Sequence, residues 1–468
     1  MPPADAQARQ ERFRRLLRAP LVAMAFAAPL AMGAVHEAVF VPLLALAWLI
    51  GLLSWGRAQW ARAMGTESPP VPGTRLLAAL HALVLLQLLP LPPAILKTVS
   101  PGSFAFYDRV SLVPLTEWRP ISVNPADSAR GLAFLFGMSL LFAAAFRELA
   151  HERWRRRLCG TVVAAAFVMT LAALVQASSA HPTRIWGLWQ PRWDWGVFGP
   201  YVSKNHFAGY MAMAIPLGIA FAAEAFLRLR QAWAGRRRGW VALGGPDGNA
   251  TIRLSAVAMV LVVGLLASRS RGGLLAGAAA VGVLPLALPR QRARALALVA
   301  LIALAGIAWM DLTATRAAFA TRGVQSSRLD LWSDALRMFP DFPILGAGFN
   351  AFGTAYIPYQ AVARYEWYGE AHNEYLQALL DTGVVGGTLV LGLVAVLLRR
   401  AWAAAAQGPL EAGLLGAVTA CLVHNVVDFN WQIPANAATF AMLAGLAVQR
   451  RAEATVARAD LDPHRSAA

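Results

Sequence analysis

The chain has 468 residues, of which 58% are hydrophobic and 14% are charged, and its mean hydropathy is +0.50. This composition is too apolar for an ordinary soluble protein and indicates a polytopic membrane protein. The formal net charge of +17 does not indicate a nucleic acid partner, because the basic residues fall in short clusters between apolar runs, a pattern typical of membrane topology.

Apolar runs of about twenty residues predict about twelve transmembrane helices. In chain order these runs lie near residues 19–35, 37–55, 75–95, 131–147, 158–178, 205–226, 254–270, 272–289, 294–310, 374–398, 409–425 and 433–449. We expect helices because a lipid-exposed backbone must satisfy its own hydrogen bonds, and no stretch alternates with the period of two that a barrel needs. The predicted fold class is therefore an all-α, polytopic membrane protein.

A long polar interval divides the predicted helices into two groups. We expect an N-terminal membrane region over residues 1–310, a loop over 311–373, a C-terminal membrane region over 374–450 and a cytoplasmic tail over 451–468. Of the 42 Lys and Arg residues, roughly 28 fall on one side of this topology and roughly 14 on the other. The positive-inside rule then places both termini in the cytoplasm and the long loop on the outer, periplasmic face.

The turn between the seventh and eighth predicted spans carries two arginines, Arg269 and Arg271, beside two glycines. Guanidinium groups hold phosphate oxygens through several donors in a fixed plane, and glycine allows close backbone approach. We interpret the turn as a candidate anion site, with Arg271 favoured. The alternative is that the arginines extend to the membrane interface without binding a ligand.

The long loop contains a predicted amphipathic helix that begins near Arg328 and ends before Pro340. Its apolar positions are Leu329, Trp332, Leu336 and Phe339. The sequence leaves open whether this helix faces an active cavity or only packs against the bundle.

His372 lies at the mouth of the span that begins at residue 374. A helix N-terminus disfavours an imidazolium, so the ring is expected to be neutral and able to accept a proton. Asn373 is a suitable N-cap for that helix. His424, at the outer end of a later span, is expected to orient or cap, and a purely structural role for either histidine is the alternative.

The predicted spans hold few ionisable groups, and the examples are His81 and Glu224. Ion-coupled carriers generally need buried ionisable groups along a path, so this scarcity argues against a proton-driven transporter. The two cysteines, Cys159 and Cys421, lie in different predicted helices and indicate neither a disulfide framework nor a metal site.

Several short motifs occur in a fixed order: residues 270–273, positions 328 and 332, and residues 343–348, 371–376 and 381–383. Together with residues 87–93, 204–208 and 424–429, they resemble the O-antigen ligase and polysaccharide polymerase superfamily. The resemblance covers most of the chain beyond residue 85, and the order of the motifs is more specific than any one of them.

The resemblance implies a bacterial inner-membrane glycosyltransferase of the GT-C type that works at the periplasmic face without a metal or another cofactor. Such enzymes transfer a glycan from undecaprenyl pyrophosphate to an acceptor hydroxyl on a glycolipid such as the lipid A core, on another glycan or on a protein. By position, Arg271 and Arg328, with Arg269, would bind the pyrophosphate and His372 would act on the acceptor. The possible supporting residues are Lys204, Asn205, Asn373 and His424.

The sequence is also compatible with other functions. A polymerase that joins lipid-linked repeats would use the same site chemistry as a ligase. A flippase or exporter of lipid-linked glycans, or a non-catalytic scaffold of an assembly complex, is a further alternative.

Overall fold

The computed structural model describes residues 4–65, 69–111, 113–192, 196–233, 243–287, 328–361 and 367–449. These parts are helical, and their β-structure is limited to isolated bridges. Six helices are long and apolar enough to cross a membrane, and four shorter apolar helices accompany them. The all-helical class is confirmed, and the chain is a multi-pass membrane protein. The predicted span at 294–310 lies outside the described residues.

The long or apolar helices are α1 (Ala4–Leu30), α2 (Glu37–Ala63), α3 (Thr74–Leu88), α6 (Pro125–Glu148), α7 (Glu152–Ala177), α8 (Lys204–Trp233), α9 (Pro246–Ala267), α10 (Arg271–Ala287), α15 (Glu374–Ala405), α16 (Pro409–His424) and α17 (Pro434–Ala447). Each predicted span within the described residues overlaps one of them. Boundaries shift where proline intervenes: α3 ends at Leu88 rather than residue 95, because Pro90 and the prolines after it cannot continue a helix.

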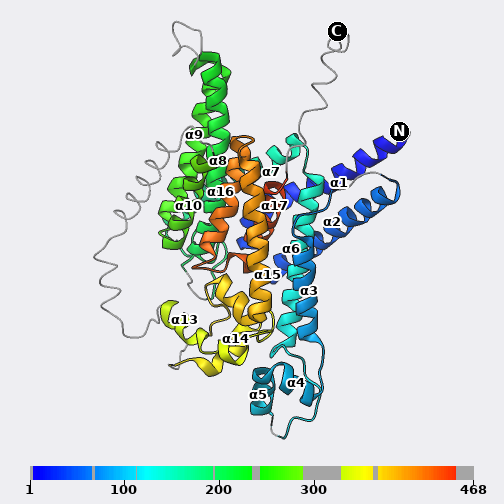
Figure 1. Cartoon of the computed structure of the whole chain (residues 1–468). Helices are drawn as coiled ribbons and strands as arrows, with labels where there is room; N and C mark the ends of the chain where they lie inside the picture. Colours follow the sequence, from blue (N-terminus) through cyan, green and yellow to red (C-terminus); the bar gives the residue numbers. More distant parts are fainter. Residues whose placement is uncertain are drawn as a thin grey trace.

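The three C-terminal helices lie between two groups of N-terminal helices (Figure 1). Helix α15 packs against α3 and α16, helix α16 packs against α8 and α10, and α17 packs against α6. Helices α16 and α17 are rich in alanine and glycine, and nearly all of their residues are buried. Small side chains let helix backbones approach closely in a membrane, so these two helices suit the centre of the bundle.

Short helices gather at one end of the bundle, which is the lower end of Figure 1. They are α4 (Pro93–Val99), α5 (Pro101–Val110), α13 (Arg328–Leu336) and α14 (Phe352–Ala355). Helix α13 confirms the predicted amphipathic helix, but its predicted apolar face is partly wrong. Leu329 and Leu336 are exposed, whereas Leu331, Ala335 and Met338 are buried, because they pack in one cluster with residues of α14 and the chain around it.

Gln87 ties the end of α3 to the loop and to α15. Its Nε2 donates hydrogen bonds to the carbonyl oxygens of Leu345 (2.6 Å) and Asp381 (2.8 Å), and its Oε1 accepts one from the Phe349 N–H (2.9 Å). Three of the motifs noted in the sequence, at 87–93, 343–348 and 381–383, therefore meet at one point. Their shared role there is to hold the loop on the bundle.

The expectation that the predicted spans hold few ionisable groups needs correction, since buried carboxylates such as Asp381 and Glu411 also lie inside them. Asp381 Oδ2 accepts a backbone hydrogen bond from the loop at 2.9 Å, and Glu411 lies 3.2 Å from the Arg155 guanidinium. Buried carboxylates require such partners because desolvation of an unpaired charge is costly. One oxygen of each of these two carboxylates thus has a partner that ties neighbouring segments together.

Gly383 provides a direct test of how the loop meets α15. Its φ of 64° and ψ of −170° interrupt the helix in a conformation essentially limited to glycine, and a Cβ there would lie 2.1 Å from the Ile344 oxygen. We predict that Gly383→Ala destabilises the protein by at least about 1–3 kcal/mol from backbone strain alone.

The measurement is the thermal unfolding temperature of the purified protein in detergent. The matched control is Gly56→Ala in α2, where a Cβ meets nothing within 4 Å and the unfolding temperature should stay the same or rise. Equal unfolding temperatures for Gly383→Ala and the wild type would contradict this role of Gly383.

Candidate functional site

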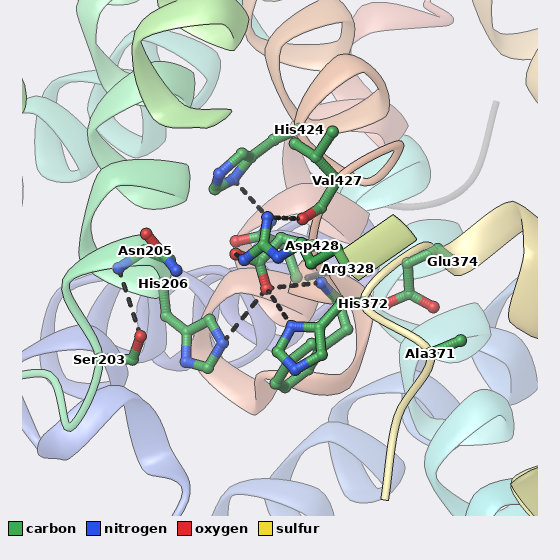
Figure 2. Close-up of polar contacts among 12 residues, drawn as sticks. Ser203, Asn205, His206, Arg328, Ala371, His372, Glu374, His424, Val427 and Asp428 are labelled. Carbon is green, nitrogen blue, oxygen red and sulfur yellow. Dashed lines mark hydrogen bonds and ion pairs between the residues drawn. The ribbon is translucent and has the colours of Figure 1, made fainter. Parts of the chain in front are cut away.

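One buried carboxylate, that of Asp428, brings together groups from distant parts of the chain (Figure 2). Asp428 lies in the connection between α16 and α17, and its side chain is 1% exposed. Its Oδ2 lies 3.3 Å from Arg328 Nη2, and its Oδ1 lies 3.7 Å from both His206 Nε2 and His372 Nδ1. The site therefore draws on α8, α13, the segment before α15 and the α16–α17 connection.

The surroundings of Asp428 favour its ionised form. Burial by itself disfavours a charged carboxylate, but the close contacts with His206 and His372 outweigh burial and hold the pKa of Asp428 well below its usual value. The Phe429 N–H also donates a hydrogen bond to Oδ1 at 3.0 Å. Asp428 is thus a fixed negative charge beside one arginine and two imidazoles.

The ring of Phe429 contacts both of these histidines. Its centroid is 4.7 Å from that of His206 and 4.7 Å from that of His372, with both pairs near edge-to-face. Such aromatic contacts limit the rotation of the imidazoles. Phe429 therefore fixes the two histidines on the carboxylate that precedes it.

Backbone geometry holds His372 in an unusual conformation. Its φ of 51° lies in the left-handed region, which non-glycine residues rarely adopt. On one side, the Ala371 N–H donates to Gln377 Oε1 (2.8 Å) and the Ala371 oxygen accepts from Trp332 Nε1 (2.8 Å). On the other side, Asn373 caps α15 by accepting from two N–H groups of its first turn. Strain that the surroundings enforce in this way is typical of functional sites.

The His372 ring is accessible on one side only. Its side chain is 29% exposed, while Nδ1 is buried and faces Asp428. A carboxylate behind Nδ1 orients the ring and stabilises the imidazolium that forms when Nε2 takes a proton. The 3.7 Å separation is longer than a hydrogen bond, and such contacts commonly tighten when substrate binds.

Arg328 is the first residue of α13, and its side chain contacts the connection between α16 and α17. Its Nη1 donates to the Val427 carbonyl oxygen and its Nη2 faces Asp428, yet 37% of its side chain is exposed. The guanidinium is thereby anchored on one edge while the remainder is open to solvent. An arginine in this state can bind an anion without a large reorientation.

The N-terminus of α10 lies against the connection between α16 and α17. A Cβ on Gly272 would be 2.8 Å from Val427 Cγ2 and 3.0 Å from His424 Cδ2, so the first turn of α10 is in direct contact with these residues. Arg271 opens this helix with an exposed side chain. Arg269, two residues earlier, is also exposed and has a φ of 54°.

The supporting residues expected from the sequence lie in different surroundings. His424 is fully buried, and its Nδ1 lies 2.7 Å from Asn430 Nδ2. Lys204 and Asn205 open α8, and no contact joins either side chain to Asp428 within the described residues. The next residue, His206, makes that contact instead.

Sequence reasoning did not single out Asp428, His206 or Glu370. The first two lie inside stretches that contributed to the family resemblance, and Asp428 is an acidic residue in a short connection between two apolar helices. Glu370 precedes His372 by two residues, and burial raises its pKa above the usual value while His372 opposes that effect. A search for acidic residues near the candidate histidines would have found Asp428 and Glu370, but not His206.

A cavity of about 510 Å³ begins beside Glu370 and Glu374. Most of the remaining lining is apolar and comes from α3, α6, α15 and α17, among them Leu77, Leu80, Phe134, Met138, Leu393, Leu397 and Phe440. The polar residues Arg130, Asn350, Gln377 and Asp381 also line it. Along α15 the lining runs from Glu374 to Leu397, which corresponds to about 34 Å at 1.5 Å per residue. That length is comparable to the whole hydrocarbon core of a bilayer, about 30 Å.

The described residues contain no group of three His, Cys, Asp or Glu side chains arranged to hold a metal ion.

We predict that Asp428→Asn destabilises the protein, because the amide removes the charge that compensates Arg328 and the two histidines. The expected loss is about 1–3 kcal/mol, the usual cost of removing one partner of a buried polar contact. Thermal unfolding in detergent measures it. Asp108→Asn, at an exposed position of α5, is the control, and an equal effect of the two substitutions would argue against Asp428 as the organising charge.

A family model built from known proteins matches part of the chain. The family model for O-Antigen ligase matches residues 254–391, a segment that contains Arg269, Arg271, Arg328 and His372. A search of curated proteins finds no match. Over this segment, the chain is similar to the O-antigen ligase family.

Proposed function

We propose that this protein is a glycosyltransferase that transfers a glycan from undecaprenyl pyrophosphate to an acceptor hydroxyl. The family assignment supports an enzyme with ligase-type or polymerase-type activity. The observation that carries the finer proposal is the cluster of His372, Asp428 and Arg328 beside a long apolar cavity. The reaction is placed at the periplasmic face of the bacterial inner membrane, with both termini in the cytoplasm, in keeping with the distribution of basic residues.

His372 is the proposed base of the reaction. The acceptor oxygen attacks the anomeric carbon of the donor glycan while His372 Nε2 takes the hydroxyl proton. A new bond forms between the acceptor oxygen and the anomeric carbon, and the bond from that carbon to the pyrophosphate oxygen breaks. The electron pair stays with the pyrophosphate, and Asp428 stabilises the positive charge formed on the imidazole.

The leaving pyrophosphate gains negative charge as the bond breaks, so positive groups nearby lower the barrier. Arg328 is anchored by Val427 and Asp428 but partly exposed, which suits contact with this group. Arg271 stands at the N-terminus of α10, where helix N–H groups also favour an anion. Arg269 is assigned a supporting role because the same turn presents it.

The cavity beside Glu370 supports a lipid-linked substrate. Its apolar lining matches a hydrocarbon chain, and its length along α15 exceeds the depth of a single leaflet, about 15 Å. A polyprenyl chain is long enough to follow it, whereas an ordinary acyl chain reaches only through one leaflet. The polar end of the cavity at Glu370 and Glu374 lies next to His372, as a lipid-linked glycan requires.

A ligase and a polymerase would use this same site and differ in the acceptor. In a ligase the acceptor is a glycolipid such as the lipid A core, and in a polymerase it is another lipid-linked repeat. The lengths of the products distinguish them, because a ligase transfers a completed chain whereas a polymerase extends a chain by repeats.

We predict that His372→Ala lowers the rate of glycan transfer by about 10²–10⁴-fold, the range for loss of a general base. The measurement uses purified protein in lipid vesicles, a lipid-pyrophosphate-linked glycan as the donor, and gel analysis of the product. His181→Ala, in an exposed connection, is the matched control and should retain activity. Wild-type rates for His372→Ala at equal protein level would contradict the assigned base.

A further inference from the structure

A second groove lies between α7, α8 and α9, near the end of the bundle opposite His372. Its volume is about 520 Å³. Arg156 and Arg157 line one end, and the remainder is formed mainly by apolar residues: Val163, Ala164, Phe167, Val168, Phe221, Leu254 and Val257. The groove therefore combines a basic end with an apolar trough, which is the distribution of polarity found in a phospholipid.

Gly160 leaves the middle of this groove open. A Cβ built there meets nothing within 4 Å, so no packed neighbour requires glycine at this position. Glycine in a helix interior is less favourable than alanine by about 0.5–1 kcal/mol. Its presence deepens the groove between the arginines and the apolar residues of α7.

The two arginines at the groove differ in their partners. Arg156 lies 2.6 Å from Glu224 and 3.6 Å from Glu152, so its charge is compensated within the protein. Arg157 lies over the ring of Trp154 at 4.7 Å and forms no ion pair within the part of the chain that the structure describes. The exposed guanidinium of Arg157 thus retains hydrogen-bond donors for a phosphate.

The groove is about as long as one leaflet is deep. From Arg157 to Val168 along α7 the distance is about 16 Å at 1.5 Å per residue. This is close to the depth of one leaflet, half of the hydrocarbon core of about 30 Å. The groove therefore matches an acyl chain of a lipid in one leaflet, in contrast to the longer cavity beside Glu370.

We propose that this groove binds an anionic glycerophospholipid, with its phosphate on Arg157 and one acyl chain over Gly160 toward Val168. Basic pockets between transmembrane helices are known to select anionic lipid headgroups. The site is separate from the Asp428 cluster and does not depend on the proposed glycan transfer.

The test measures lipid binding to the purified full chain by native mass spectrometry. The probes are phosphatidylglycerol and phosphatidylcholine with the same acyl chains. The wild type should bind phosphatidylglycerol more tightly. Arg157→Gln should weaken that binding by about tenfold, the equivalent of one charge-assisted hydrogen bond. The matched control is Arg153→Gln, an exposed arginine of the same helix that does not line the groove.

Gly160→Leu tests the trough separately from the headgroup, because its side chain should occupy the path of the acyl chain and weaken binding of both lipids. Val168→Trp, at the other end of the trough, is the second variant if Gly160→Leu does not fold. Equal binding of the two lipids by the wild type would overturn the proposal. So would equal effects of Arg157→Gln and Arg153→Gln, or full binding by a folded groove-filling variant.

Discussion

The need to compensate the buried charge of Asp428 is the constraint on which the site depends. An isolated carboxylate is too costly to bury, so Arg328 and two imidazoles must face it. These partners come from segments more than two hundred residues apart in sequence, between His206 and Asp428. One carboxylate therefore joins the separate segments of the site.

Packing of the helices places these segments together at one end of the bundle. Helices α16 and α17 are built of small residues and pack at the centre, so the connection that carries Asp428 sits among the ends of α8, α10 and α15 (Figure 1). Gln87 and the kink at Gly383 hold the loop against α15. At the opposite end, the Arg155–Glu411 pair joins α7 to α16. The site is thus rigidly supported, while its arginines remain partly exposed.

The sequence predicted most of the helices because apolar length is a local property that each span displays by itself. It also predicted that His372 lies immediately before the next helix and that Asn373 caps that helix. It did not predict Asp428, because a single carboxylate in a short connection has no periodicity or spacing that marks it. The buried face of α13 was partly wrong for a similar reason: Leu329 and Leu336 fit the helical period, but tertiary packing selected Leu331 and Ala335 instead. The contact of α10 with His424 depends on the folded bundle and was likewise beyond the sequence pattern.

We propose that the protein consumes a glycan carried on a lipid pyrophosphate. The most direct measurement is the identity and the leaflet of the lipid-linked species that accumulate when the protein is removed from its cell. We expect undecaprenyl-pyrophosphate-linked glycan on the periplasmic leaflet, as long chains for a ligase and as single repeats for a polymerase. Accumulation on the cytoplasmic leaflet would contradict transfer and indicate an exporter.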